Sequence, residues 1–501
     1  MVSVSKTIIV LIFIGLVAIG VLVYYLSSRT EPRPMHEVLR ELLAEIKKRH
    51  KMGFDVVEAQ YYTLSALYHY RLGHHEKARE LITKANELLE DSEQLPTLPE
   101  RNWSVVDSNV EVARIPTVWD FVPIGTVFVK TKNGYLAYPR NDKKWKLSCF
   151  IMIAIGQTDD GQQIFYQGRL PLMPEENPFK PRIYINGEWV IPELIFVGPL
   201  YFDEGEKFGL PTVYQYDLSG DYMQTLSYDQ ENRVWIHTIE SVRDERIILK
   251  IKARTKGVPM WLGEWNGSFI VHGVYARRDD FDLWGGFWDV GDMEMTLSLR
   301  GKTYYVKGVF IFDRASHRTY LKEKSSKMGS PLSFSCIVIY QDNLAVMITH
   351  STNPSPLNID NRFEHQLRIN IFSLNMSIAT TDFELYDDNS LQPSNFTLIG
   401  HFNGGYFNLT GYVIEFWPEK WVASKGTWWN SEGYYTWGRA FILWRGEIVV
   451  ENKTIAVNAW GAGEFTRYGK SGAETKKCDV NGFSCWGRWS DNGIEELIGE
   501  D

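Results

Sequence analysis

Apolar and polar residues alternate along most of the chain after residue 106, in short runs that turn residues separate. Runs such as "GTVFVKT", "RIILKIKA" and "KTYYVKGVFIF" have the period of two that is typical of half-buried strands. Asn-Gly at 133–134 and 186–187 favours type I′ hairpins, because both central residues of that turn need a positive φ. No long helical pattern interrupts these runs, so we predict an antiparallel, mainly β body. Its length is better suited to two sandwiches or barrels than to one.

The pattern before this body is helical, over residues 34–95. In "MHEVLRELLAEIKKRH" the apolar residues recur at helical spacing on one face. The next segment, residues 59–90, resembles a tetratricopeptide unit, and the matching positions are Tyr62, Ala66, Gly73, Ala78 and Ala85. The resemblance implies a neck that binds a protein partner or oligomerises. A helical stalk or pad against the next domain is the alternative, since a single unit cannot bury both faces of a solenoid.

An uncharged stretch of twenty residues, Thr7 to Leu26, lies at the N-terminus. A helix of that length spans about 30 Å, the thickness of the hydrocarbon core of a bilayer. We predict a transmembrane anchor over residues 1–30, with a cleaved signal peptide as the alternative. The excess of Arg and Lys after the stretch favours a cytoplasmic body. Six Asn-x-Ser/Thr triplets favour the other side, and we expect the β body to be extracytoplasmic.

Charge and cysteine content exclude several classes of function. The net charge is −9 and the isoelectric point is near 5.8, so the chain has no electrostatic footprint for nucleic acid. Cys478 and Cys485 lie seven residues apart in a tail with Gly and Asn, a spacing that favours a small disulfide loop. No second Cys pair or close His accompanies them, and no phosphate loop or nucleophile elbow occurs. We expect no metal site and no cofactor.

Aromatic residues make up 14% of the chain, which favours large β surfaces or an apolar cavity. Acidic residues between 264 and 294 lie among several Trp residues, a combination that would also suit sugar binding or glycoside hydrolysis. An acidic loop region at a barrel mouth is the alternative. The candidate ligand-binding residues are Trp261, Trp265, Trp284, Trp288, Tyr304, Trp437 and Trp460.

One strand pattern occurs twice. "GKTYYVKGVFIFDR" at 301–314 and "NKTIAVNAWGAGEF" at 452–465 match at an offset of 151, and Glu464 stands where Asp313 stood. Residues 248–317 resemble the end of the first domain of the carotenoid 1,2-hydratase-like (AttH-type) proteins, and "WGAGEFTRYG" resembles the closing strand of the second domain. The resemblance implies two tandem lipocalin-like β-barrels, over residues 100–325 and 326–501.

The same resemblance implies catalytic candidates. Asp313 and Glu464 correspond to the acid at the end of the closing strand, and a protonated carboxyl in an apolar pocket could donate a proton to an alkene. Asp313 is followed by Arg314-Ala315-Ser316-His317 rather than by the His and aromatic-Gly pair of the hydratases, which places hydratase or isomerase chemistry in doubt. The alternative is that both acids only end strands, held by neighbouring Arg residues or by solvent. His272 is a further candidate, with a satisfied core histidine as the alternative.

Three functions follow from these patterns. The first is a membrane-anchored protein that binds an apolar, lipid-like or isoprenoid-like ligand in a barrel cavity. The second is a carbohydrate-active or glycan-binding surface protein. The third is a structural or interaction protein that works through its helical neck. Whether the chain is an enzyme is left open.

Overall fold

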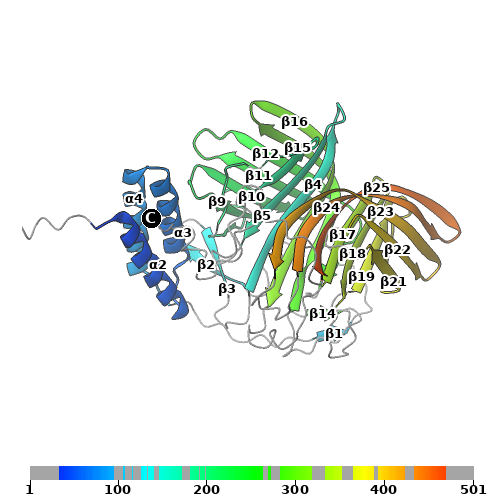
Figure 1. Ribbon diagram of the computed structural model, residues 1–501, viewed down its shortest axis with the longest axis horizontal. Helices are drawn as coiled ribbons and strands as arrows, with labels where there is room; N and C mark the ends of the chain where they lie inside the picture. Colours follow the sequence, from blue (N-terminus) through cyan, green and yellow to red (C-terminus); the bar gives the residue numbers. More distant parts are fainter. Residues whose placement is uncertain are drawn as a thin grey trace, which may run out of the picture. The chain divides into compact units, whose positions relative to one another are not determined.

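The computed structural model describes most of the helical segment and of the β body (Figure 1). The chain divides after Ser92 into two compact units. None of the helices in the described chain is long and apolar enough to cross a membrane, and the run at 7–26 lies outside the described residues. His272, Trp265, Cys478 and Cys485 also lie outside them. The described ranges are 33–94, 105–107, 116, 126–131, 134–139, 146–171, 181–190, 192–197, 199–262, 269–271, 283–318, 333–352, 365–388, 393–423 and 434–469.

The first unit contains three helices, α2 (Met35–Lys51), α3 (Val57–Arg71) and α4 (His75–Glu90). Apolar residues of all three form one small core. Ala66, Ala78 and Ala85 have no exposed surface, as expected of small residues where helices approach closely. The turn after α3 uses Gly73 at φ +78°, a conformation that glycine adopts without steric cost. The match to a tetratricopeptide unit stays a prediction.

The second unit is mainly β, with two large antiparallel sheets that are barrel-like. A fourteen-stranded sheet has the order β2-β3-β8-β9-β10-β11-β12-β15-β16-β4-β5-β6-β7, with β13 paired to β15. A separate parallel pair joins β1 (Val105–Asp107) and β14 (Phe269–Val271). The strands of the large sheet are β2 (Thr126–Thr131), β3 (Gly134–Pro139), β4 (Lys146–Thr158), β5 (Gln163–Pro171), β6 (Arg182–Ile185), β7 (Glu188–Val190), β8 (Tyr201–Asp203), β9 (Thr212–Tyr216), β10 (Tyr222–Asp229), β11 (Val234–Ser241), β12 (Ile247–Thr255), β13 (Met260–Leu262), β15 (Leu283–Leu299) and β16 (Lys302–Arg318).

This first sheet curls around a core, and we refer to it as barrel 1. Gln224 Nε2 on β10 donates a hydrogen bond of 2.9 Å to the carbonyl oxygen of Arg169 on β5, although six steps along the sheet separate the two strands. Trp235 on β11 stacks on Phe312 on β16 with ring centroids 4.1 Å apart. Such contacts across the concave side need a strongly curved sheet. The enclosed core is rich in aromatic and sulfur-containing side chains.

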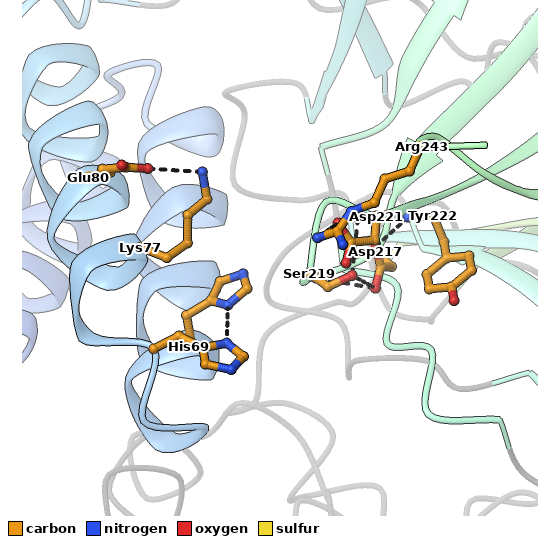
Figure 2. A network of polar contacts seen from close by, with 9 residues as sticks. His69, Lys77, Glu80, Asp217, Ser219, Asp221, Tyr222 and Arg243 are labelled. Carbon is orange, nitrogen blue, oxygen red and sulfur yellow. Dashed lines mark hydrogen bonds and ion pairs between the residues drawn. The ribbon is translucent and has the colours of Figure 1, made fainter. Parts of the chain in front are cut away.

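The β9–β10 turn illustrates how a buried acid shapes a connection (Figure 2). Asp217 is 2% exposed, and its carboxylate accepts hydrogen bonds from the hydroxyl and backbone N–H of Ser219 and from the backbone N–H of Tyr222. At the same turn, Arg243 pairs with Asp221 at 2.6 Å. The side-chain bonds of Asp217 replace ladder bonds that the turn cannot form.

The nine-stranded sheet has the order β20-β19-β18-β17-β25-β24-β23-β22-β21, and we call it barrel 2. Its first and last strands, β20 and β21, are separated by only two residues of chain, so the sheet must curl until its edges meet. Thr380 Oγ1 at the end of β20 donates a hydrogen bond to the carbonyl oxygen of His401 on β22, across that seam. The strands are β17 (Ser333–Gln341), β18 (Leu344–Thr352), β19 (His365–Ile371), β20 (Met376–Thr380), β21 (Phe383–Asp387), β22 (Asn395–Phe402), β23 (Gly405–Ala423), β24 (Tyr434–Val450) and β25 (Lys453–Gly469), with a 3-10 turn at Phe372–Leu374.

The repeated strand pattern occupies equivalent places in the two barrels. β15 and β16 form a hairpin of 17-residue strands, and β24 and β25 form a second whose bounds are those of the first shifted by 151 residues. Both two-residue turns, 300–301 and 451–452, have positive φ at both positions, as type I′ geometry requires. β16 then pairs with β4, and β25 pairs with β17. Each hairpin therefore joins the end of its barrel to a strand near its beginning.

A third core lies between the barrels. It contains Val309 and Ile311 of β16 together with Val338, Phe441 and Ala462 of barrel 2, all at most 8% exposed. Side chains alternate along a strand, so the outer faces of both closing hairpins are buried against each other. The two barrels share this core.

Candidate functional site

Asp313 lies on the face of β16 that is directed toward barrel 2. Phe310 and Phe312 belong to the core of barrel 1, whereas Val309 and Ile311 belong to the core between the barrels. Asp313 continues the second set, as the sequence pattern predicts for this strand. Its carboxyl group is therefore directed to the barrel interface and not into the interior of barrel 1.

Glu464 lies on the corresponding face of β25. Its carboxylate forms an ion pair of 2.7 Å with Arg439 on the neighbouring strand β24, and the two side chains are 11% and 6% exposed. Two opposite charges in such close contact compensate each other, which offsets the cost of burying them. This pair places one fixed ion pair at the interface.

The corresponding pair in barrel 1 is different. Trp288 faces Asp313 across β15 and β16, as Arg439 faces Glu464 across β24 and β25. Both residues of the first pair precede those of the second by 151 positions. Barrel 1 thus has a tryptophan where barrel 2 has the counter-ion, and Asp313 has no cation as its cross-strand partner.

Burial raises the pKa of Asp313 to about 7, and the negative charge of Glu464 adds to the rise. Arg439, Trp288 and Arg169 oppose it without cancelling it. Asp313 Oδ1 is inaccessible to solvent and, among the described residues, has no hydrogen-bond partner. The indole nitrogen of Trp288 is also buried, and its N–H is close enough to the Asp313 carboxyl to lower the pKa of that group. The arrangement is a carboxyl group that can hold a proton at neutral pH in apolar surroundings.

A second buried acid lies inside barrel 1. Asp289 is 1% exposed and accepts a hydrogen bond of 2.9 Å from Trp235 Nε1. Burial raises its pKa to about 6, and the bond from Trp235 together with the charge of Arg233 opposes the rise. The sequence pattern favours an acidic loop cluster that includes Asp289. The alternation of β15 instead directs it inward, on the same face as Phe287 and Met293.

His237 is a buried polar residue that was not among the residues predicted from the sequence. Its Nδ1 lies 2.7 Å from the carbonyl oxygen of Thr225, which can only accept, so Nδ1 carries the proton. Nε2 then accepts a hydrogen bond of 2.6 Å from the Tyr166 hydroxyl. Burial lowers the pKa of His237 to about 4. The strand alternation in "VWIHTIES" places this residue on the inner face, and that was the available signal.

A cleft of about 1000 Å³ lies between the barrels, at one end of the shared core. Its floor contains Ile155, Val309, Phe441 and Trp460, and the last two rings are parallel with centroids 4.8 Å apart. The rim is polar, with charged side chains and carboxamides. The rim residues are Gln157, Gln163, Lys252, Arg254, Lys256, Asp292, Glu294, Lys307, Tyr340, Gln341, Asp342, Asn343 and Asn458.

Polar contacts join the barrels beside this cleft. Tyr340 of barrel 2 donates a hydrogen bond to Asp292 of barrel 1, which also pairs with Lys256. Asn370 of β19 exchanges two hydrogen bonds with the backbone of Val258, an N–H···Oδ1 bond of 3.1 Å and an Nδ2–H···O bond of 2.9 Å. Asn370 is 1% exposed, so both polar ends of its side chain are paired within the barrel contact.

The predicted site residues do not gather at one place. Trp288 lies beside Asp313, and Trp460 lines the cleft. Tyr304 packs against the core of barrel 1, with Lys302 Nζ 4.6 Å from its ring centroid. Trp261, Trp284 and Trp437 lie in β13, β15 and β24, but the side chains of these three residues are outside the described part. Within the described chain, no group of three His, Cys, Asp or Glu residues could hold a metal ion.

Comparison with known proteins gives no family model and no curated protein that matches the chain. Among solved structures, CghA with Sch210972 is 11% identical, with 65% of this chain and 89% of that chain covered and a TM-score of 0.39. Kievitone hydratase from Nectria haematococca is 11% identical, with 65% and 90% covered and a TM-score of 0.35. A protein assigned as AttH from Nitrosomonas europaea is 10% identical, with 64% and 92% covered and a TM-score of 0.38. The two-barrel architecture follows from the strand order of this chain itself.

Proposed function

We propose that the two barrels together bind an amphiphilic ligand, with its apolar body on the floor of the cleft between them and its polar end at the rim. We also propose that residues 7–26 anchor the protein in a membrane and that the β body is extracytoplasmic. The observation that carries the binding proposal is the aromatic floor of the cleft inside a charged and amide-rich rim.

The size of the cleft supports this proposal. Its volume of about 1000 Å³ is at the upper end of the range for small-molecule sites, about 300 to 1000 Å³. An acyl chain or a fused-ring compound fits such a space. The cleft is also bounded by two domains that share a core, which is a frequent place for ligand sites.

The floor offers a specific apolar surface. Trp460 is half-buried and its outer part is available to a ligand, while Phe441 beneath it is 8% exposed and supports the indole. A ring that is held in place by a stacked partner loses little conformational entropy on binding. This favours an apolar or planar group as the part of the ligand nearest to Trp460.

Binding, and not turnover, is the function that we propose. Asp313 is suited to hold a proton, but it does not line the cleft. Ile311 lies between Val309 of the cleft floor and Asp313 on the same face of β16, and Ile311 is 3% exposed. A hydratase or isomerase step would need a ligand to reach past this packed residue.

A binding assay on the purified full chain tests the proposal. Displacement of a fluorescent fatty acid should show saturable binding, and Trp460→Ala should weaken it about tenfold or more, as loss of a central aromatic contact does. Tyr305→Ala is the matched control, because Tyr305 is a 69% exposed aromatic on β16 outside the cleft lining. Binding that is equal in wild type and Trp460→Ala would refute the site.

Glycan binding is the second candidate, and the carboxamides of the rim favour it. Gln157, Gln163, Gln341, Asn343 and Asn458 can each donate and accept hydrogen bonds, and Trp460 could stack on a sugar ring. A glycan array probed with the full chain and with Trp460→Ala distinguishes the two candidates. Specific glycan signals that Trp460→Ala removes, without any fatty-acid binding, would replace the first proposal by the second.

Placement at the membrane and the role of the helical neck need separate tests. The full chain should stay with membranes after an alkaline carbonate wash, and protease added to intact cells should digest the β body. Deletion of residues 35–91 should release co-purifying proteins if the helical unit binds a partner. A body that resists protease until the cells are lysed would contradict the extracytoplasmic placement.

A further inference from the structure

We propose that the ligand of the inter-barrel cleft carries an anionic head, a carboxylate or a phosphate, that Arg254 and Lys307 bind at the rim. This inference rests on the proposed function and names the class of its ligand.

The cleft has a surplus of positive charge in a negative protein. The whole chain has a net charge of −9. The cleft lining contains four basic side chains and three acidic ones; they are Lys252, Arg254, Lys256 and Lys307 against Asp292, Glu294 and Asp342. A cleft with excess positive charge raises the local concentration of anions, although the rest of the protein surface is negative.

Asp292 is already engaged and cannot fully neutralise Arg254. It lies opposite Arg254 in the register of β12 and β15. Its carboxylate instead pairs with Lys256 and accepts the hydrogen bond of Tyr340 across the barrel contact. Arg254 therefore lies beside an acid whose charge is directed to another cation.

Glu294 is shared in a similar way. It lies opposite Lys252 on β12 and opposite Lys307 on β16, so one carboxylate lies between two lysines. The side chains of Arg254 and Lys307 make neither a hydrogen bond nor an ion pair with any residue in the described ranges. Both are exposed at the rim, where a ligand can reach them.

The two cations lie within reach of one ligand that also contacts the floor. One row of register partners crosses β12, β15, β16 and β4, and it contains Arg254, Asp292, Val309 and Ile155. Neighbouring strands are about 4.8 Å apart, so Arg254 is roughly 10 Å from Val309 along the row. Lys307 precedes Val309 by two residues, roughly 7 Å along the strand. An acyl chain that starts between these cations can extend over Val309 toward Trp460.

Four competitors against the fluorescent fatty acid test the proposal on the full chain. They are an unlabelled fatty acid, a lysophosphatidic acid, the fatty alcohol of equal length and inorganic phosphate. The two anionic amphiphiles should compete about tenfold or more better than the alcohol, as a charge-assisted hydrogen bond provides. Higher salt should reduce this preference, because the rim charges are exposed. Inorganic phosphate should not compete, because it lacks the apolar body.

Variants then assign the preference to residues. The double variant Arg254→Gln/Lys307→Gln should bind the acid no better than the alcohol. Lys250→Gln is the matched control, because Lys250 is an exposed cation on the same face of β12 outside the cleft. The control should keep the preference for the acid.

The outcomes separate this inference from the proposed function. Equal affinity for alcohol and acid in wild type would overturn the anionic head and leave the amphiphile site in place. The same conclusion would follow if the double variant kept the preference. Competition by inorganic phosphate alone would mean a free-anion site and overturn the amphiphile. Failure of every long-chain compound to bind would overturn both proposals.

Discussion

Asp313→Asn should change the pH dependence of stability in a defined direction. The folded protein holds the pKa of Asp313 at about 7, whereas 3.8 is the ordinary value of the group. Between these values the folded state binds a proton that the unfolded state releases. The stabilising contribution of this proton is complete below pH 3.8 and is lost as the pH rises to about 7.

The size of the effect follows from the same two values. A shift of one pKa unit corresponds to about 1.4 kcal/mol, so a rise from 3.8 to about 7 corresponds to about 4 kcal/mol between acidic and slightly alkaline pH. Asn is neutral at every pH and has nearly the same shape as the protonated acid. At pH 8 the variant should therefore be more stable than wild type by an amount of that order, and at pH 4 the two should be similar.

Urea unfolding of the full chain, followed by Trp fluorescence at pH values from 4 to 8, measures this difference. Asp289→Asn is the companion variant, because burial raises the pKa of Asp289 to about 6 at a separate place inside barrel 1. It should remove a different part of the pH dependence, because its carboxyl group faces the interior of barrel 1 whereas that of Asp313 faces the other side of the sheet. His237 acts in the opposite direction, because its pKa of about 4 makes its contribution disappear as the pH falls below 6.5.

An unchanged pH profile in Asp313→Asn would refute the reasoning. It would mean that Asp313 is ionised in the folded protein and that a cation compensates it. Arg439→Met is the reciprocal test, because it leaves Glu464 buried without its counter-ion and should cost about 3 to 5 kcal/mol. A loss much smaller than this would show that the barrel interface admits water at the acid site.

Further predictions concern the packing of the barrels and the C-terminal segment that contains Cys478 and Cys485. Gly308→Val should cost about 1 to 3 kcal/mol in urea unfolding, because a Cβ at this position would collide with the Ile155 carbonyl oxygen; an unaltered midpoint would contradict the strand spacing. Asn370→Ala should cost about 1 to 3 kcal/mol, because the half-buried backbone N–H and carbonyl of Val258 lose their partner; a neutral result would mean that the barrels are not joined there. Non-reducing peptide mapping should find Cys478 and Cys485 linked, with free thiols as the opposing result.

Much of the architecture was predictable because strand alternation and turn chemistry are local. The offset of 151 between the closing strands identified two equivalent hairpins, and their observed bounds repeat at that offset. Type I′ turns were predicted elsewhere from Asn-Gly, yet the two hairpin turns are Arg-Gly and Glu-Asn at 300–301 and 451–452. These less typical pairs adopt the same positive φ because the long strands on either side impose it.

The sites were less predictable. Asp313 and Glu464 were singled out by the repeat, but as acids of two separate barrels. The Coulomb interaction between them arises only where the outer faces of the two closing hairpins pack together. The sequence of one strand does not predict which other element will pack on its outer face. The cleft likewise combines residues of β4, β12, β15 and β16 with residues of β17, β24 and β25, far apart in the chain.

By itself the sequence determined which residues of a strand share a face, since backbone geometry sets the period of two without reference to the rest of the molecule. It also determined that the closing strands are equivalent and that a helical segment precedes the β body. The tertiary structure alone decided which face is inside a barrel and which is against the other barrel. That choice sets the dielectric surroundings of Asp313, Asp289 and His237 and hence the direction of each pKa shift, because desolvation depends on every neighbour that excludes water.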